Sequence, residues 1–444
     1  MSPDTARNSA PMGRLTPRTL LLNVGVVLLG MLAMIGIFIG SANLSNDGPR
    51  QQVAAAFADG TLSFEIYRML EPVPGFIVAE SDSNSSCVMY ALMLSSSSDV
   101  FGRGIWSDPV IPTCEGLAVA VNGGPTMTFP WFRYWQGASA ITKVALTFVS
   151  VYVWQLFLTG LLALLLALLI LHTWRFSRTF SLGVAVSTLM TTDLVWQGLS
   201  VVHGVSASIG LLFTLLAGIA FSRRWPARWG IVVLAGATYA MVAQMLIPMA
   251  FAILISMMAM LPILRTRTAW NWRQVLVGPL AGCTWVGGYV LGLLSRYVWV
   301  ATFGPGLDEL RAEVNGTSGV FLTKSLLDPF YQVVGLLTKT WLNVGFMQVG
   351  LMLFFLVLGW SLARGGASGY FSKAALVSLS PTIIGISWLL VWATHTNHTF
   401  VHVLLAMILL NVLFASEVGR AVSRCRLASI DPAQESLVRS TLTD

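Results

Sequence analysis

The sequence predicts an all-α, polytopic membrane protein with about ten transmembrane helices and a large outer loop after the first of them. Of its 444 residues, 55% are hydrophobic and only 10% are charged, whereas roughly a quarter of the residues in a soluble domain are charged. Apolar runs of about 18 to 25 residues recur along the chain, and helices of that length cross a hydrocarbon core of about 30 Å. These runs show no strand-like alternation of apolar and polar residues, which excludes a transmembrane β-barrel.

The apolar runs predict the spans in chain order. They lie at about 20–40, 145–171, 179–199, 205–222, 229–245, 247–264, 275–295, 343–363, 375–394 and 400–416. The first run resembles a cleaved signal peptide, because basic residues precede it and Gly40, Ser41 and Ala42 follow it. Its apolar core is longer than that of a typical signal peptide, which favours a retained membrane anchor.

The basic residues orient these spans. A net charge of +7 would point to nucleic acid in a soluble protein, but here the cations gather in the short connections, where they report topology. With a cytoplasmic N-terminus the positive-inside rule is obeyed throughout, which places inside Arg14, Arg18, Arg175, Arg178, Arg223, Arg224, Arg228, Arg265, Arg267, Arg273, Arg364, Lys373, Arg420, Arg424 and Arg426. The sequence thus predicts a multi-pass protein of the cytoplasmic membrane with both termini in the cytoplasm and no nucleic-acid partner.

The chain divides accordingly into a cytoplasmic segment 1–19, a transmembrane domain 20–416 and a cytoplasmic tail 417–444. Two outer loops interrupt the membrane domain, at 41–143 and 296–342, and they hold most of the acidic residues. Because the inner connections are short and basic, we expect the functional groups on the outer side.

Two of the four cysteines, Cys87 and Cys114, share the first outer loop. A disulfide between them would contribute about 3 kcal/mol on the loop-entropy model, in a segment too small to be held by apolar burial alone. We therefore expect a disulfide, and the alternative is a pair of buried unpaired thiols.

Polar residues near the outer end of the third span form the first candidate site. Asp193 and Trp196 belong to an Asp-Leu-Val-Trp-Gln-Gly motif inside the apolar run. An isolated carboxylate costs a few kcal/mol in lipid, so Asp193 should face the interior of the bundle. It either contacts substrate or makes a structural hydrogen bond to a neighbouring helix.

A histidine-rich segment before the last span is the second candidate. His395, His398 and His402 would share one face if the segment is helical, and Asn397 lies among them. Three imidazoles can bind zinc, but no cysteine or acid adjoins them to complete a metal site. Contact with a sugar or phosphate, or structural hydrogen bonding, are the other interpretations.

The third candidate is an Arg-Tyr-Trp-Gln-Gly motif where the first outer loop returns to the membrane. Arg133, Tyr134 and Trp135 can form an interfacial aromatic belt. Equally, a guanidinium binds phosphate through two hydrogen bonds, and aromatic faces stack on sugars.

Acidic residues of the first loop are the fourth candidate. Asp47 follows the first span closely, and Asp82 lies two residues after Glu80. Either aspartate can serve as the general base that deprotonates an acceptor hydroxyl. The Glu80 and Asp82 pair can instead hold a divalent cation, the one candidate cofactor. The alternative is that these acids are ordinary solvated loop residues.

Together, these motifs resemble those of uncharacterised bacterial membrane proteins from surface-polysaccharide gene clusters. In that family the first motif usually reads Arg-Tyr-Trp-His-Gly-Tyr and the last outer motif Asn-His-Ser-x-x-His. The overall plan is also similar to the C-type glycosyltransferases, which take sugars from polyprenyl phosphates. Two departures stand out: Gln136 replaces the histidine, and the usual Thr-Asp before Met93 and Leu94 is replaced near Ser86 and Cys87.

The resemblance implies a glycosyltransferase of the bacterial inner membrane. It implies Asp47 or Asp82 as the base, with Arg133, Tyr134, Trp135, Asp193, Trp196, His395, Asn397, His398 and His402 as substrate contacts. The partners it implies are a polyprenyl-linked sugar donor, a glycan or lipid-linked acceptor and membrane lipid. A transporter or flippase of lipid-linked glycans and a polysaccharide polymerase or ligase are the alternatives.

Overall fold

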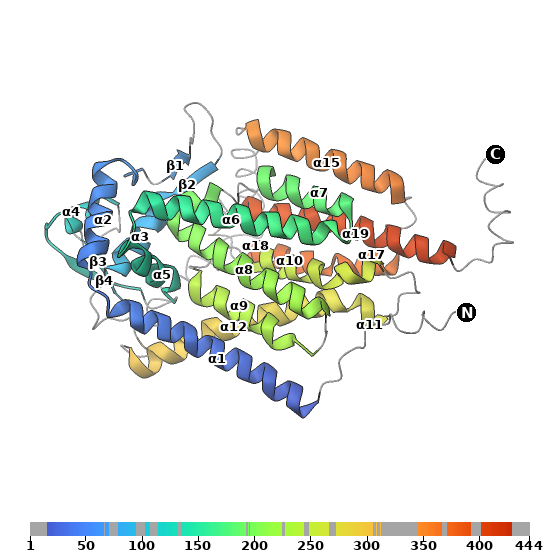
Figure 1. Ribbon diagram of the computed structural model, residues 1–444, viewed down its shortest axis with the longest axis horizontal. Coiled ribbons are helices and arrows are strands. Elements are labelled where there is room, and N and C mark those ends of the chain that lie inside the picture. Colours follow the sequence, from blue (N-terminus) through green and yellow to red (C-terminus); the bar gives the residue numbers. More distant parts are fainter. Residues whose placement is uncertain are drawn as a thin grey trace.

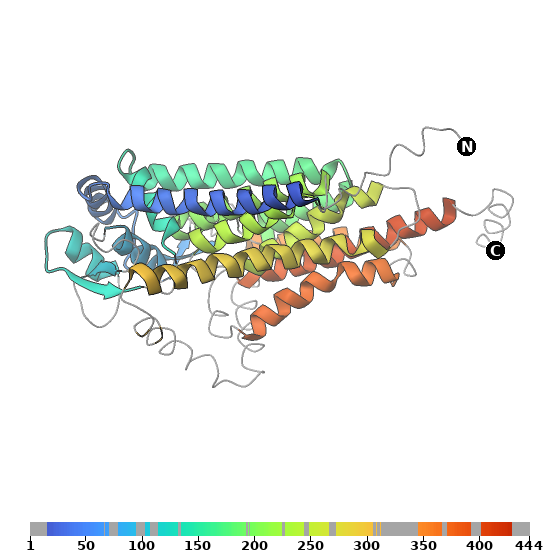
Figure 2. The same ribbon diagram turned by 90° about the horizontal axis from the view of Figure 1, so that it is seen from below.

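The computed structural model describes residues 16–65, 67–70, 79–94, 103–106, 114–131, 135–191, 194, 196–223, 227–243, 248–265, 272–304, 308, 311, 345–365, 371–391 and 401–428. The helices lie along one long axis and pack side by side, while the elements of the first predicted outer loop gather at one end (Figures 1 and 2). Helix α1 begins and helix α19 ends at the opposite end, as expected for termini on one side.

Six of the described helices are long and apolar enough to cross a membrane. They are α1 (Pro17–Ala42), α6 (Val151–Trp174), α8 (Val201–Arg223), α12 (Val277–Phe303), α15 (Gly345–Gly365) and α19 (Val401–Ala428). This confirms an all-α polytopic membrane protein but not the predicted number of ten spans. Helices α12 and α19 also continue past the predicted boundaries at 295 and 416.

The four remaining predicted spans coincide with shorter or broken helices. The run 179–199 contains α7 (Arg178–Val186) and two irregular turns, and 229–245 contains α9 (Trp229–Val242). The run 247–264 contains α10 (Pro248–Met260) and the 3₁₀ turn η5 (Leu261–Arg265). The run 375–394 contains α17 (Lys373–Ser378) and α18 (Ser380–Val391), and the short α11 (Trp272–Val275) precedes α12.

Helix α1 packs on the bundle along one narrow face. Thr16 and Thr19 form a capping box at its start, and Pro17 occupies the first turn, where its missing N–H costs nothing. Buried residues recur every three or four positions: Asn23, Val27, Met31, Met34, Phe38 and Ser41. The opposite face exposes leucines such as Leu21 and Leu29, as expected for a helix that contacts lipid on that side.

Asn23 links α1 to the start of α9. Its side-chain amide donates to the carbonyl of Ala227 (2.8 Å) and accepts from the backbone N–H of Gly230 (2.7 Å). The first N–H groups of a helix have no partner within the helix, so a side chain from α1 caps α9 from outside.

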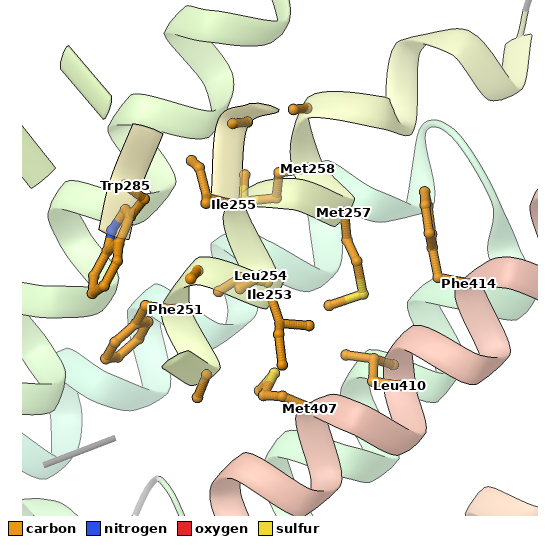
Figure 3. Close-up of a cluster of buried hydrophobic side chains, with 14 of the residues drawn as sticks. Phe251, Ile253, Leu254, Ile255, Met257, Met258, Trp285, Met407, Leu410 and Phe414 are labelled. Atoms are coloured by element: carbon orange, nitrogen blue, oxygen red, sulfur yellow. The ribbon is translucent and has the colours of Figure 1, made fainter. Parts of the chain in front are cut away.

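Helices α10, α12 and α19 lie within the largest apolar core of the described residues, to which α6, α7, α8, α9, α15 and α17 also contribute. Phe251, Ile253, Met257 and their neighbours on α10 are buried against Trp285 of α12 and against Met407, Leu410 and Phe414 of α19 (Figure 3). Helix α10 is surrounded by protein on all sides, which explains why apolar residues cover its whole circumference.

Helices α9 and α12 approach very closely through glycine. A side chain at Gly288 would overlap the backbone of Val233, and one at Gly292 would lie 2.7 Å from the Ala237 carbonyl. Small residues at a helix crossing allow backbones to pack together where hydrophobic driving force is weak.

The described part of residues 47–146 forms a cap on the end of the bundle. It contains α2 (Asp47–Ala58), α3 (Ser83–Met93), α4 (Cys114–Val121), α5 (Gly137–Leu146) and two hairpins, β1 (Tyr67–Leu70) with β2 (Ala79–Asp82) and β3 (Arg103–Trp106) with β4 (Met127–Pro130). Cys87 and Cys114 form the predicted disulfide, with their Cα atoms 5.2 Å apart. The disulfide therefore joins α3 to α4 inside the cap.

Candidate functional site

The third predicted span is broken near the cap. After α7 the chain forms a π-helical turn, η3 (Ser187–Thr191), and then a 3₁₀ turn, η4 (Trp196–Leu199), before α8 begins. Serine, threonine and glycine weaken a regular helix here. Irregular backbone at membrane depth is tolerated only where protein or water surrounds it, and π-turns often occur at functional sites.

Two glycines hold η4 in place. A side chain at Gly198 would overlap the backbone of Thr159 on α6, and one at Gly204 would lie 2.9 Å from the Gly198 Cα. The backbone N–H of Ser200 also donates to the carbonyl of Gln197 (3.0 Å). The turn is thus pressed between α6 and the first turn of α8 with little freedom to shift.

The cap lies directly on this break. Strand β2, which ends at Asp82, packs against η4, and α3 packs against α8. The hydroxyls of Ser86 and Ser200 are 3.3 Å apart across the contact. Two segments that the sequence analysis singled out separately, around Asp82 and Trp196, are therefore neighbours.

Several polar side chains are buried at this contact. Gln197 and Tyr90 are completely inaccessible to solvent, and Ser200 and His203 nearly so. Burial raises the pKa of the Tyr90 phenol, so the group is neutral and can both donate and accept a hydrogen bond. Buried hydroxyl and amide groups normally have partners, which makes their concentration beside the broken helix a candidate site.

The Trp135 ring is buried at the same end of the bundle. Its indole N–H donates to the Gly292 carbonyl (3.1 Å) and lies as close to the Ser295 hydroxyl. The ring packs between Phe38 and Trp299, and the guanidinium of Arg296 lies 5.3 Å from its centre. In this structure Trp135 is an internal packing residue, with no exposed face for an aromatic belt.

Two cations are buried at the cap end. Arg296 is 1% exposed and donates to the Trp131 carbonyl (3.5 Å). Lys143 is 3% exposed, and its ammonium donates to the Ala42 carbonyl at the end of α1 (3.4 Å). Burial lowers the pKa of Lys143, although the negative end of a helix favours a cation there.

Asp47 has a local structural contact. It is exposed at the first position of α2, and its carboxylate accepts from the Ser45 hydroxyl (2.8 Å). Helix α2 packs on α4, α5 and α6. An acid in the first turn of a helix is stabilised by the helix dipole, so Asp47 stabilises the start of α2, and its catalytic role stays a prediction.

Most of the other predicted site residues lie outside the described part of the chain. These are Arg133, Tyr134, Asp193, His395, Asn397 and His398. Asp82, Trp196 and His402 are placed by backbone only, in β2, η4 and α19. Among the described residues no group of three His, Cys, Asp or Glu could hold a metal ion.

The sequence analysis missed the burial of Arg296, Tyr90 and Ser86. Arg296 was counted as a loop cation because the apolar run ends at 295, but the helix continues to Phe303. Tyr90 lies four residues after Ser86 in a segment that also contains Cys87, and this helical spacing was the available signal.

No protein-family model, curated protein or solved structure matches this chain.

Proposed function

We propose that the protein is a membrane glycosyltransferase that moves a sugar from a polyprenyl-phosphate donor to a cell-surface glycan on the outer face of a bacterial inner membrane. The observation that supports this most is the contact between β2, which carries Asp82, and the break in the third span. This contact puts the backbone of a strand that ends at an acidic residue beside η4, and we propose that a lipid-linked sugar and a soluble acceptor meet here.

In the proposed reaction Asp82 is the general base. Its carboxylate takes the proton of an acceptor hydroxyl, the hydroxyl oxygen bonds to the anomeric carbon, and the bond from that carbon to the polyprenyl phosphate breaks. The leaving phosphate needs a cation, a role we assign to Arg133 with His398. Arg296 beside Trp135 adds positive charge at the same end of the bundle.

Replacement of Asp82 by Asn tests this function. The variant keeps the size of the side chain but cannot accept the proton, so surface-glycan synthesis in a deletion strain should fall by at least about a hundredfold. Asp59→Asn is the matched control, because Asp59 is an exposed cap acid whose carboxylate accepts from the backbone N–H of the neighbouring Thr61. Wild-type glycan with Asp82→Asn, at normal protein level, would contradict the proposal.

The divalent-cation alternative predicts a different response. Glu80 and Asp82 are alternate residues of β2, and paired carboxylates are suitable ligands for a hard cation. Under that alternative, a chelator added to purified protein in nanodiscs should abolish sugar transfer, and Mg²⁺ or Mn²⁺ should restore it. Transfer that is insensitive to chelation leaves Asp82 with the base role alone.

A translocase of lipid-linked glycans is the second candidate, and the broken span favours it. Many transporters bind substrate where a helix is interrupted. The two functions separate in proteoliposomes, where a translocase moves a fluorescent lipid-linked sugar between leaflets without changing it. Movement without any new glycosidic bond, unaffected by Asp82→Asn, would favour the translocase.

A further inference from the structure

The contact between the cap and the broken span contains polar groups without a protein partner. Gln197 is completely buried, yet within the described structure neither its amide nitrogen nor its amide oxygen has a hydrogen-bond partner. The hydroxyl of the fully buried Tyr90 has none either. Unsatisfied groups of this kind are rare in native proteins and call for an explanation, such as an unseen water or ligand.

These groups belong to the two elements that meet at the serine pair. Tyr90 lies one helical turn after Ser86, so both residues occupy the same face of α3. Gln197 lies one turn before Ser200 and is linked to it by a backbone hydrogen bond. Because Ser86 and Ser200 are 3.3 Å apart, Tyr90 and Gln197 each lie about one turn along the chain from one contact between α3 and the residue that joins η4 to α8.

Gln197 cannot easily move to find a protein partner. Gly198, the next residue, is pressed onto Thr159 so closely that a methyl group would not fit. Gly204 contacts the carbonyl of Gln197 itself, where an added methyl would lie 3.1 Å from the oxygen. The fold therefore fixes the backbone that carries this unsatisfied amide, and a fixed backbone favours a binding group that is organised before its ligand arrives.

We infer that this contact is a subsite for the sugar ring of the donor lipid. The inference rests on the proposed function and assigns the part of the site that recognises hydroxyl groups. An amide, a phenol and two serine hydroxyls each donate and accept hydrogen bonds, as sugar hydroxyls require. A phosphate would need cations, whereas Gln197, Tyr90 and the two serines are neutral hydrogen-bonding groups. A metal ion would use carboxylates such as those of Glu80 and Asp82 on β2, not these groups.

Removal of the unsatisfied groups should separate stability from binding. Gln197→Met and Tyr90→Phe preserve shape but eliminate the unpaired atoms, so thermal stability in detergent should stay equal or rise. Thr214→Val is the matched control. The Thr214 hydroxyl is also buried without a partner in the described structure, and it lies on α8, the helix that follows Ser200, away from this contact. It should gain stability without any effect on ligand binding.

The direct test measures lipid binding by the full-length protein in nanodiscs. The probes are a polyprenyl phosphate that carries glucose, galactose, mannose or N-acetylglucosamine, and the same lipid without sugar. Wild-type protein should bind at least one sugar-bearing lipid about tenfold more tightly than the bare lipid, the effect of one or two added hydrogen bonds. Gln197→Met and Tyr90→Phe should reduce this preference severalfold while affinity for the bare lipid stays unchanged.

Two results would overturn the subsite. One is a sugar preference that survives in both variants, and the other is the absence of any preference in the wild type, which would mean that internal water alone satisfies Gln197 and Tyr90. A sugar preference that depends on Gln197, found together with normal glycan synthesis by Asp82→Asn, would retain the subsite and reject the transferase. The two proposals therefore fail separately.

Discussion

Gly198 sets the distance between the broken span and α6. A methyl group at this position would overlap the backbone of Thr159, and overpacking of this kind costs about 1 to 3 kcal/mol. We expect Gly198→Ala to lower the unfolding temperature in detergent and to reduce glycan synthesis, because η4 also carries Gln197.

Gly160→Ala is the control for that change. Gly160 is one residue from Thr159 on the same helix, but a methyl group there meets nothing within 4 Å. Alanine is a better helix former than glycine by about 1 kcal/mol, so this variant should be at least as stable as the wild type. Equal unfolding temperatures for the two variants would show that η4 is not held by this contact.

Asn23 makes a second prediction at the residue scale. Asn23→Leu removes both hydrogen bonds to the start of α9 and leaves the Gly230 N–H and the Ala227 carbonyl without this partner. We expect a loss of about 1 to 3 kcal/mol of stability, measured by denaturant unfolding in mixed micelles. Asn43→Ala, at the exposed end of the same helix, should change stability by less than about 0.5 kcal/mol.

The sequence alone identified residue types at the site better than their environments. Gln197 stood in a recognised motif, but its lack of a partner depends on glycines that pack against other helices. Arg296 was assigned to a loop because a charged residue ended the apolar run. The Arg296 guanidinium lies over the Trp135 ring, a contact that allows the charged residue to lie inside the helix. Hydropathy cannot detect such a contact between residues far apart in the chain.

At the scale of elements, the disulfide joins α3, which faces the broken span, to α4 on the far side of the cap. Replacement of both Cys87 and Cys114 by Ser should cost about 2 to 5 kcal/mol of cap stability and make the cap sensitive to protease added outside cells. The membrane helices should remain folded, since their larger core does not include the cap.

The free cysteine Cys283 provides the comparison for the disulfide. It is exposed on α12 and unpaired, so Cys283→Ser should leave protease resistance unchanged. A thiol reagent should label Cys87 and Cys114 only after reduction, and labelling before reduction would contradict the disulfide.

A buried ion pair joins three helices at the basic end of the bundle. Glu417 of α19 pairs with Arg420 and accepts from Ser177 before α7 (2.6 Å) and from Ser361 of α15 (2.7 Å). Glu417→Leu leaves the partly buried guanidinium of Arg420 without this partner and should destabilise by about 1 to 3 kcal/mol. This loss is measurable as a lower unfolding temperature.

A double replacement tests whether the pair itself stabilises the fold. If the penalty comes from the unpaired charge, Glu417→Leu with Arg420→Leu should recover most of the stability. If the double variant is as unstable as Glu417→Leu alone, the serine hydrogen bonds, rather than the charge balance, hold these helices together.

The broken third span shows where element prediction reached its limit. Hydropathy predicted one continuous helix over 179–199, but the chain forms α7, η3 and η4 there. Apolar content does not reveal a π-turn or a 3₁₀ turn, because these depend on the partners that receive the displaced backbone groups. The same reason explains α10, which changes to the 3₁₀ turn η5 at Leu261, within the predicted span.

At the scale of the whole molecule, the basic residues should face the cytoplasm and the cap should face outward. In a background with Cys283 and Cys425 replaced by Ser, a cysteine in place of Asn122 on the cap should react with an impermeant thiol reagent in intact cells. A cysteine in place of Trp272, which is exposed at the basic end, should react only after the cells are broken. Reversed labelling would invert the topology.

The class of fold was predictable because lipid imposes a strong constraint on composition. The distribution of charge predicted that the basic connections lie at one end of the bundle and the first outer loop at the other. The placement of the cap was not predictable. Its contact with η4 pairs segments around residues 82 and 197 that share no periodic pattern, and only the close packing of α3, α6 and α8 brings them together. Hydropathy alone could not give the number of spans, since short apolar helices inside a bundle need not cross the membrane.

The apolar core beneath the cap has a consequence for the order in which the chain is made. Cys87 and Tyr90 are buried in one cluster with Val202 and Val242, which the ribosome adds much later. At about 5 to 20 residues per second, the cap waits on the order of ten seconds after its own synthesis for the helices that complete it. Disulfide closure needs none of those helices, so the bond between Cys87 and Cys114 can hold α3 and α4 together during the interval, before their apolar surface meets its partners.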